Sequence, residues 1–180
     1  PRLKAFYPND VLSTARDILF LWVARMVMMG LRFAGDIPFS DVYVHSVIQA
    51  PDGRRMSKSL GTGIDPLEVI GSHGADATRY GLLKMSSTQD VRFNVGMIDE
   101  GRKLANKLGN VSRLILANAG ESKPDVRPAS VEERWILARL DAARGHIERE
   151  LEAFDFAGTV NTLYHLTFDD FCDWYAEAIK

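Results

Sequence analysis

The spacing of apolar residues changes once along this chain of 180 residues. Up to about Asn94, short β-rich runs alternate with segments of helical period, and beyond it the helical period continues almost to the end. Residues 11–13 predict the end of a strand, and residues 42–48 (VYVHSVI) predict a nearly continuous apolar strand, which is typical of a strand covered on both faces in a parallel sheet. Residues 17–31 between them have the period of an amphipathic helix. We therefore predict a βαβ unit, and such units bind ligands beyond the carboxyl ends of their strands.

Helix-capping signals divide the region that follows. Asp65 and Pro66 form a strong helix start, with an acceptor at the N-cap and a proline in the first turn, and Gly74 ends this helix. A second helix is predicted over residues 76–85. The helix predicted over residues 97–118 carries an apolar stripe that we expect to be buried: Leu104, Leu108, Val111 and Ile115. Away from that stripe we expect a row of basic residues: Arg102, Lys103, Lys107 and Arg113.

A linker and further helices complete the pattern. Residues 119–129 contain one glycine and two prolines and predict the linker. Ser130 and Glu133 have capping-box spacing, which predicts the start of another helix, and a break is expected near Phe154 and Asp155. The sequence thus predicts an α/β domain over residues 1–94 and a helical segment over residues 95–180.

Composition narrows the classes of function. A net charge of -2 argues against a generally basic nucleic-acid binder, so any contact with RNA has to come from local patches. The single cysteine, Cys172, lies in an apolar stretch and is expected to be a buried, inert thiol; it can form neither an internal disulfide nor a zinc cluster. Arg25 interrupts the longest apolar run, so no membrane span is expected, and we expect the reducing cytoplasm as the compartment because no signal peptide is visible.

The segment most informative about chemistry is the loop over residues 53–61, which contains Arg55-Met56-Ser57-Lys58-Ser59. A compact ammonium such as that of Lys58 can follow the negative charge that grows on a triphosphate as pyrophosphate leaves. Glycines flank the segment and would let it close over a ligand and withdraw. The alternative to a phosphate-binding loop is a solvated, charged turn with no chemical role. This loop, which we call the clamp loop, closely resembles the KMSKS loop of the class I aminoacyl-tRNA synthetases.

Other segments point to one branch of that family. Residues 17–26 (DILFLWVARM), 74–80 (GADATRY) and 171–177 (FCDWYAE) resemble motifs of the valyl enzymes in the same order. The valyl enzymes are several-fold longer, and their His-x-Gly-His motif is absent from this sequence. The resemblance therefore implies an internal fragment of a valyl-tRNA synthetase, with the C-terminal half of a Rossmann-like catalytic domain followed by the start of an anticodon-binding helical bundle.

The resemblance implies roles for individual residues. Lys58, with Arg55, would stabilise the leaving pyrophosphate, and Trp22 would form a wall of the amino-acid pocket. Asp17 would position ribose. A further set would contact ATP: His45, Val47, Ile48, Met56, Ser57 and Ser59. The basic row of the long helix would contact tRNA, since the region after the clamp loop runs along the inner side of the tRNA in this subclass.

Each of these roles has a structural alternative. Asp17 could serve as a first-turn carboxylate that favours the helix dipole, and Trp22 could be a core tryptophan. His45 could be a satisfied core histidine within a strand, and the basic row could be a solvated helix face. His73, His146 and His165 lack metal-ligand spacing, and we assign them no chemistry.

The sequence departs from the family pattern at three positions. Ala15 stands where the family has the glycine of a Gly-x-Asp turn, which changes how closely the backbone can approach a nucleotide. Arg55 replaces the first lysine of the motif, and its planar fork places donors differently from an ammonium. Thr62 replaces an asparagine after the loop.

The implied reaction is the activation of valine with ATP, followed by transfer to tRNA(Val). ATP would bring Mg²⁺, for which no dedicated protein site is visible, and the full-length enzyme is expected to be monomeric. The isolated fragment would lack half of the ATP site and is expected to be inactive. Two alternatives remain: a fragment of an isoleucyl or leucyl enzyme, or a tRNA-binding module without catalysis of its own.

Overall fold

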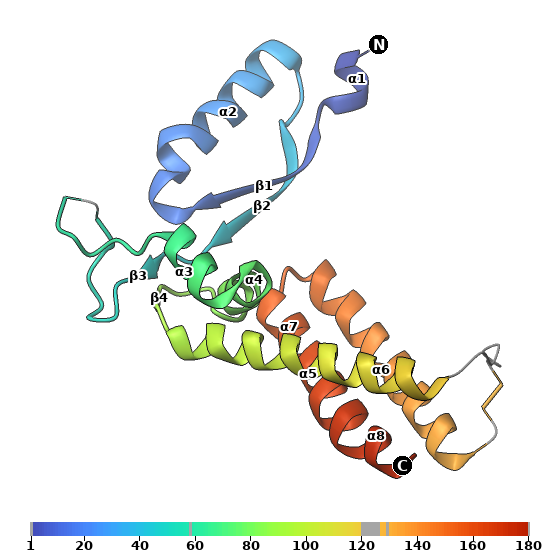
Figure 1. Ribbon diagram of the computed structural model, residues 1–180. Helices are drawn as coiled ribbons and strands as arrows, with labels where there is room; N and C mark the ends of the chain where they lie inside the picture. Colours follow the sequence, from blue (N-terminus) through green and yellow to red (C-terminus); the bar gives the residue numbers. More distant parts are fainter. Residues whose placement is uncertain (1, 58, 120–126, 129, 180) are drawn as a thin grey trace. The chain divides into compact units, whose positions relative to one another are not determined.

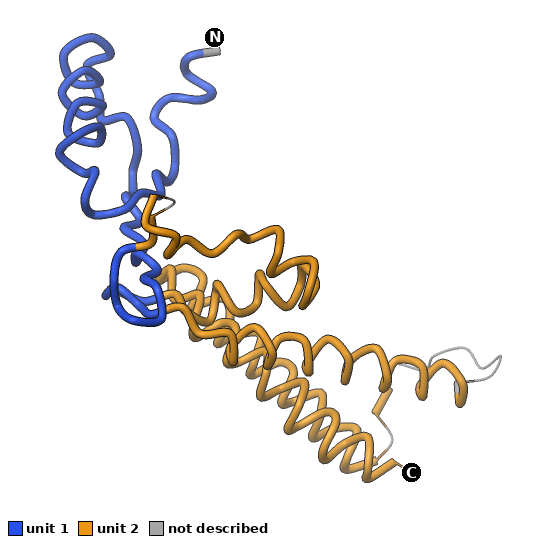
Figure 2. The backbone as a smooth tube through the Cα atoms, turned by 60° about the vertical axis from the view of Figure 1, so that its left-hand side comes forward, with its two compact units in different colours: residues 1–55, 87–92 blue, residues 56–86, 93–180 orange. Residues whose placement is uncertain are grey.

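The computed structural model describes residues 2–57, 59–119, 127–128 and 130–179. The chain forms two compact units, which Figure 2 distinguishes by colour: Pro1–Arg55 with Ser87–Arg92, and Met56–Ser86 with Phe93–Lys180. The predicted linker lies mostly outside the described residues, as does Lys58.

The first unit contains the predicted βαβ arrangement. Strand β1 (Asn9–Ala15) pairs in parallel with β2 (Phe39–His45), and Ala15 lies opposite His45 in the register, so both strands end at the same edge (Figure 1). This confirms the parallel strand order predicted from the sequence.

The strand predicted over residues 42–48 is divided. β2 ends at His45, and a separate short strand, β3 (Ile48–Gln49), pairs in parallel with β4 (Val91–Arg92). The expectation that both faces would be covered is wrong for the described residues, because Val42 and Val44 on one face are 38% and 39% exposed and Tyr43 on the other is half-buried. In this part of the chain β2 pairs with β1 alone.

A helical connection joins the two long strands, where residues 17–31 predict it. It starts with the tight turn η1 (Arg16–Ile18) and continues through a wider π-helical turn, η2 (Leu19–Val23), into α2 (Ala24–Met29) and η3 (Gly30–Ala34). Gly35 ends the connection in the left-handed conformation, with φ of 75°. Val23 in this connection is buried, whereas Trp22 remains 39% exposed.

Local capping explains the helices of the second unit. The carboxylate of Asp65 accepts a hydrogen bond from the N–H of Leu67 at the start of α3 (Pro66–His73). Gly74, with φ of 92°, separates α3 from α4 (Ala75–Lys84). These contacts confirm the predicted helix start and the predicted break, since capping satisfies N–H groups that the first helical turn leaves without partners.

Helix α4 packs closely against the first turns of α5 (Val95–Ala119). A β-carbon added to Gly101 would lie 2.7 Å from the ring of Tyr80, and one added to Gly81 would lie 3.0 Å from the backbone of Ile98. Ile98 is fully buried at this contact. The two glycines therefore allow the helices to approach each other.

The predicted burial of the α5 stripe is correct only at its beginning. Leu104 is buried, but Leu108 and Ile115 are 41% and 45% exposed. Lys107 also differs from the prediction, because it lies on the packed side of α5: its Nζ is 4.3 Å from the centroid of the Phe168 ring and 2.6 Å from a carboxylate oxygen of Asp173.

The C-terminal helices pack on one another, because the chain turns back after residue 152 and runs antiparallel to its preceding helix (Figure 1). Ser130 and Glu133 form the predicted capping box at the start of α6 (Val131–Glu152). Phe154, with φ of 57°, breaks the helix, and Asp155 caps α7 (Phe156–His165). The remaining elements are α1 (Arg2–Phe6) at the start, and η4 (Leu166–Tyr175) and α8 (Ala176–Ala178) at the end.

Two further properties bear on function. Within the described ranges, no helix combines the length and the apolarity that crossing a bilayer requires. Cys172 is buried, and burial raises the pKa of its thiol, which agrees with the predicted inert state.

Candidate functional site

The carboxyl edge of β1 and β2 gathers several of the predicted site residues. Thr14, one residue before the end of β1, is 2% exposed, and its Oγ1 accepts a hydrogen bond from the indole Nε1 of Trp22 at 3.0 Å. Asp17 follows two residues after β1 ends, in the first turn of the helical connection. Trp22 is thus tied to the strand through its nitrogen while part of its ring remains accessible.

His45 ends β2 at the same edge. Its ring is exposed, and Nδ1 lies 2.9 Å from the carbonyl oxygen of Ser46. The alternative of a buried core histidine is therefore wrong. The ATP contact of His45 stays a prediction.

The backbone of Val47 is engaged within the chain. Its N–H donates to Oδ1 of Asp90 at 3.2 Å, and its carbonyl accepts from the N–H of Val91 at 3.3 Å. The N–H of Val47 thus has a protein acceptor beside the β3–β4 pair. The predicted ATP contacts of Val47 and Ile48 stay predictions.

Two residues that the sequence reasoning missed, Arg16 and Asp90, meet at this edge. Nη2 of Arg16 lies 2.6 Å from Oδ2 of Asp90, and Nε of Arg16 lies 3.6 Å from Oδ1 of Asp17. No sequence motif identifies Asp90 as a site residue, and it lies 74 positions from Arg16 in the sequence. The sequence predicts a role only for Asp17, the residue next to Arg16.

The clamp loop begins with a tight turn in the first unit. The N–H of Ala50 bonds to the carbonyl of Arg54, and Gly53 turns the chain with φ of 85° beside the side chain of Arg92. Asp52 accepts a hydrogen bond from Nε of Arg54 at 2.7 Å; this bond lowers the pKa of the Asp52 carboxyl. Arg55 follows, bridged through its backbone to Gln49.

The rest of the loop belongs to the second unit. Thr62 closes it: its Oγ1 accepts from the N–H of Ser57 at 3.0 Å, and its own N–H donates to the carbonyl of Ser57 at 3.2 Å. The hydroxyls of Ser57 and Ser59 are 2.8 Å apart. Threonine at the position where the family has asparagine thus still supplies a side-chain hydrogen bond that holds the loop.

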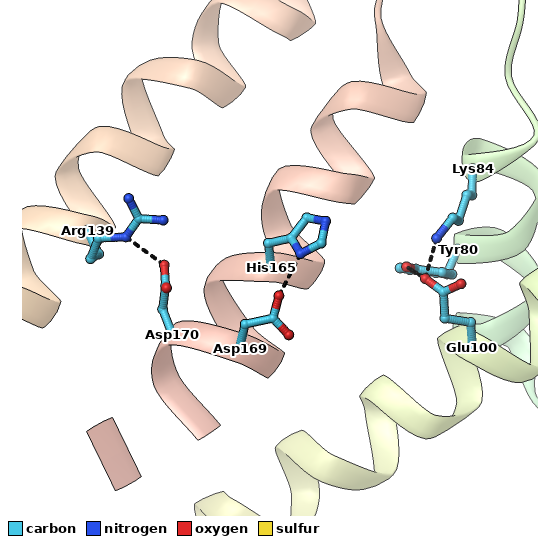
Figure 3. Close-up of polar contacts among 7 residues, drawn as sticks. All are labelled: Tyr80, Lys84, Glu100, Arg139, His165, Asp169 and Asp170. Atoms are coloured by element: carbon cyan, nitrogen blue, oxygen red, sulfur yellow. Dashed lines mark hydrogen bonds and ion pairs between the residues drawn. The ribbon is translucent and has the colours of Figure 1, made fainter. Parts of the chain in front are cut away.

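A polar cluster joins α4 to α5 (Figure 3). The carboxylate of Glu100 accepts hydrogen bonds from the hydroxyl of Tyr80, at 2.6 Å, and from the ammonium of Lys84. Burial raises the pKa of Glu100, but these bonds lower it by more, so the pKa of Glu100 lies below its ordinary value. Burial, and then the Glu100 carboxylate, raise the pKa of Tyr80.

Figure 3 also shows two polar contacts of the C-terminal helices, an arginine–carboxylate ion pair and a histidine–carboxylate hydrogen bond. Arg139 of α6 pairs with Asp170 at 2.7 Å, and His165 pairs with Asp169 at 2.6 Å. Among the described residues, no three His, Cys, Asp or Glu side chains gather as a metal-ion cluster would require.

The basic residues predicted to contact tRNA do not share one environment. Arg102 and Lys103 are exposed on α5. Lys107 is held by Asp173, which raises the pKa of Lys107, and Arg113 bonds to the side chain of Asn110 on its own helix. Arg102 and Lys103 therefore remain the accessible pair of the predicted row.

Comparison with known proteins decides the family. The family model described as "tRNA synthetases class I (I, L, M and V)" matches residues 1–94, the part that contains the strand edge and the whole clamp loop. The chain belongs to the class I tRNA synthetases. The model described as the anticodon-binding domain of tRNA ligase matches residues 133–180, which include α7 and most of α6.

Relatives within this class I family are similar over the whole chain. A valine–tRNA ligase of Geobacter sulfurreducens is 45% identical over 186 residues, covering 100% of this chain and 21% of the relative. A valine–tRNA ligase of Thermotoga maritima is 44% identical over 180 residues, covering 99% and 21%. The chain thus spans about a fifth of the length of the relatives that it matches.

Solved structures agree on the fold. A leucyl-tRNA synthetase of Agrobacterium radiobacter K84, in a ternary complex with tRNA, has a TM-score of 0.78 at 23% identity and covers 89% of this chain and 22% of its own. Methionyl-tRNA synthetase of Mycobacterium tuberculosis with methionyl-adenylate has a TM-score of 0.70 at 23% identity, covering 97% and 35%.

Proposed function

We propose that this chain is an internal part of a valine–tRNA ligase, and that it carries the clamp loop and the carboxyl edge of the nucleotide-binding sheet. The whole enzyme would join valine to the α-phosphate of ATP, release pyrophosphate, and transfer the valyl group to a terminal ribose hydroxyl of tRNA(Val). The observation that carries the proposal is the register of Ala15 opposite His45, which brings Asp17 and His45 to one edge, in a chain that also contains the RMSKS loop.

Each residue at that edge would contact a different part of the substrates. Asp17 would accept hydrogen bonds from the ribose hydroxyls, and the exposed ring of His45 would contact ATP. Trp22 would wall the valine pocket, held in place through Thr14. ATP would arrive as its Mg²⁺ complex, with the cation held by phosphate oxygens.

The clamp loop would supply the charge for the reaction. Lys58 and Arg55 would stabilise the negative charge that develops on the leaving pyrophosphate. Met56, Ser57 and Ser59 would line the loop as it closes, with the hydroxyls of Ser57 and Ser59 as donors. Thr62 would limit how far the loop opens, since it bonds twice to Ser57.

The choice of valine over isoleucine or leucine rests on the relatives. Full coverage of the chain at 42–45% identity by valine–tRNA ligases supports valine as the amino acid. The accessible pair Arg102 and Lys103 supports a tRNA contact from α5. We expect a monomeric, cytoplasmic enzyme.

The test compares the 180-residue chain with the full-length protein that contains it. Valine-dependent exchange of pyrophosphate into ATP should occur with the full-length protein and be absent with the chain alone. Exchange stimulated by isoleucine or leucine more than by valine would contradict the proposed substrate. Tight tRNA binding by a full-length protein with no exchange would favour the alternative of a tRNA-binding module.

A further inference from the structure

The carboxylate of Asp90 joins two segments that are distant in the sequence. Its Oδ2 accepts from Arg16 at 2.6 Å, across 74 positions, and its Oδ1 accepts from the N–H of Val47 at 3.2 Å, across 43 positions. The side chain is only 20% exposed. Because the next residue, Val91, pairs with Ile48 in the β3–β4 ladder, the backbone of Asp90 is fixed beside Val47.

Arg16 has two carboxylates within reach. It contacts Asp90 at 2.6 Å and its neighbour Asp17 at the longer distance of 3.6 Å. A charge-assisted bond at 2.6 Å is much the stronger of the two contacts. The guanidinium is thus drawn toward Asp90, which leaves the oxygens of Asp17 less occupied.

We infer that Asp90 is a positioning residue of the nucleotide site, acting through Arg16. By holding the guanidinium, Asp90 keeps Arg16 from pairing tightly with Asp17, so that Asp17 remains an acceptor for the ribose hydroxyls of ATP. Its second oxygen fixes Val47, which follows two residues after His45. This inference rests on the proposed function for the role of Asp17, and it assigns to Asp90 no contact with the substrate.

Substitution can separate this role from a merely structural one. Asp90→Asn keeps an acceptor for the N–H of Val47 but loses the charge that holds Arg16. The guanidinium should then move to Asp17, and ATP affinity should fall about tenfold, the size expected for one charge-assisted hydrogen bond. Removing the competitor should restore affinity, so the double variant Asp90→Asn, Arg16→Gln should bind ATP within about twofold of wild type.

The experiment is isothermal titration of the full-length protein with ATP, accompanied by valine-dependent exchange kinetics and thermal unfolding. Asp90→Asn should raise the Kd and KM for ATP while leaving the KM for valine and the unfolding temperature unchanged. Asp170→Asn is the matched control, because Asp170 pairs with Arg139 at 2.7 Å and its side chain is 16% exposed, in the helical unit. It should leave ATP binding unchanged.

The outcomes distinguish the inference from the proposed function. An ATP Kd for Asp90→Asn equal to wild type, or a loss that persists in the double variant, overturns the inference whether or not valine is the substrate. Absence of valine-dependent exchange in the wild type overturns the proposed function instead, and the ATP titration still decides the role of Asp90. If Asp90→Asn does not fold, Asp90→Ser replaces it, because it also removes the charge, and an ATP Kd equal to wild type in that variant overturns the inference.

Discussion

The indole Nε1 of Trp22 donates a hydrogen bond to the buried hydroxyl of Thr14 across 3.0 Å. The bond joins the π-helical turn η2 to strand β1, and Trp22 as a whole is 39% exposed. A tryptophan that is tethered at its nitrogen and open on part of its ring is suited to wall a pocket, because its orientation is fixed without complete burial. This geometry favours the pocket role of Trp22 over the core role.

Loss of that bond should weaken discrimination between amino acids. In the full-length protein, Thr14→Val should raise isoleucine activation relative to valine by a few-fold, because an unfixed indole lets the pocket widen. Full discrimination of one methylene, worth about 1–3 kcal/mol in such pockets, sets the upper limit. Thr14→Ser, which keeps the hydroxyl, is the matched control and should retain the wild-type ratio. Exchange kinetics with both amino acids measure the effect. A ratio that stays the same in Thr14→Val and in Trp22→Ala would return Trp22 to a purely structural role.

The clamp lysine should matter for activation and little for stability. Lys58→Ala in the full-length protein should lower the rate of valine activation by on the order of a hundredfold, the size expected when one preorganised charge is removed from a transition state. Arg144→Ala removes a cation of α6 that pairs with Glu148 on the helix surface, and should have no effect on activation. Exchange rates and thermal unfolding, measured together, test this prediction. Early unfolding of Lys58→Ala with normal activation in the cold would show that Lys58 is structural.

Two glycines of α5 should respond oppositely to the same substitution. Gly101→Ala places a methyl group 2.7 Å from the Tyr80 ring and should lower the free energy of unfolding by about 1–3 kcal/mol through overpacking. Gly109→Ala meets nothing within 4 Å and should raise it by up to about 1 kcal/mol, because alanine is the better helix former. Urea unfolding of the two variants measures both changes. Equal effects would mean that α4 and α5 are not in close contact in solution.

The Glu100 cluster should make stability depend on acid pH. The pKa of Glu100 is lowered in the folded protein, so its ionised form contributes stability above its unfolded pKa, about pH 4.3. That contribution is lost as the pH falls through the lower, folded pKa. The stability difference between wild type and Glu100→Gln should therefore be constant near neutral pH and shrink below about pH 4.3. Urea unfolding at a series of pH values tests this, and a difference independent of pH would show that the charge of Glu100 is not what stabilises the cluster.

The exposed basic pair of α5 should contribute to tRNA binding. Reversing Arg102 and Lys103 to glutamate in the full-length protein should weaken tRNA binding and reduce the slope of its salt dependence by about two or less. The double reversal of Arg134 and Arg144 on α6 controls for the change in net charge. Lys107→Glu should act mainly on stability, because Lys107 is bonded to Asp173. Wild-type affinity and salt slope in the folded Arg102, Lys103 variant would exclude this contact.

Contacts between near neighbours were predictable from the sequence. The caps at Asp65 and Ser130, the break at Gly74 and the turn at Phe154 involve residues within a few positions of one another. Their hydrogen bonds depend on local backbone geometry, so residue type and spacing determine them. The RMSKS loop and the order of strand, helix and strand were readable for the same reason, and they were enough to suggest the family.

The tertiary structure alone decided which side chains meet. Asp90 lies 74 positions from Arg16, and Lys107 lies 66 positions from Asp173, so no local pattern pairs them. The division of the strand predicted over residues 42–48 has the same origin, because β3 exists only where β4 returns to pair with it. The helical period predicts Lys107 on a solvated face, but η4 packs against α5 and brings Phe168 and Asp173 into contact with the Lys107 ammonium. Such contacts form only when elements distant in the sequence pack together. Local sequence patterns do not determine that packing, because it depends on all the contacts of the fold at once.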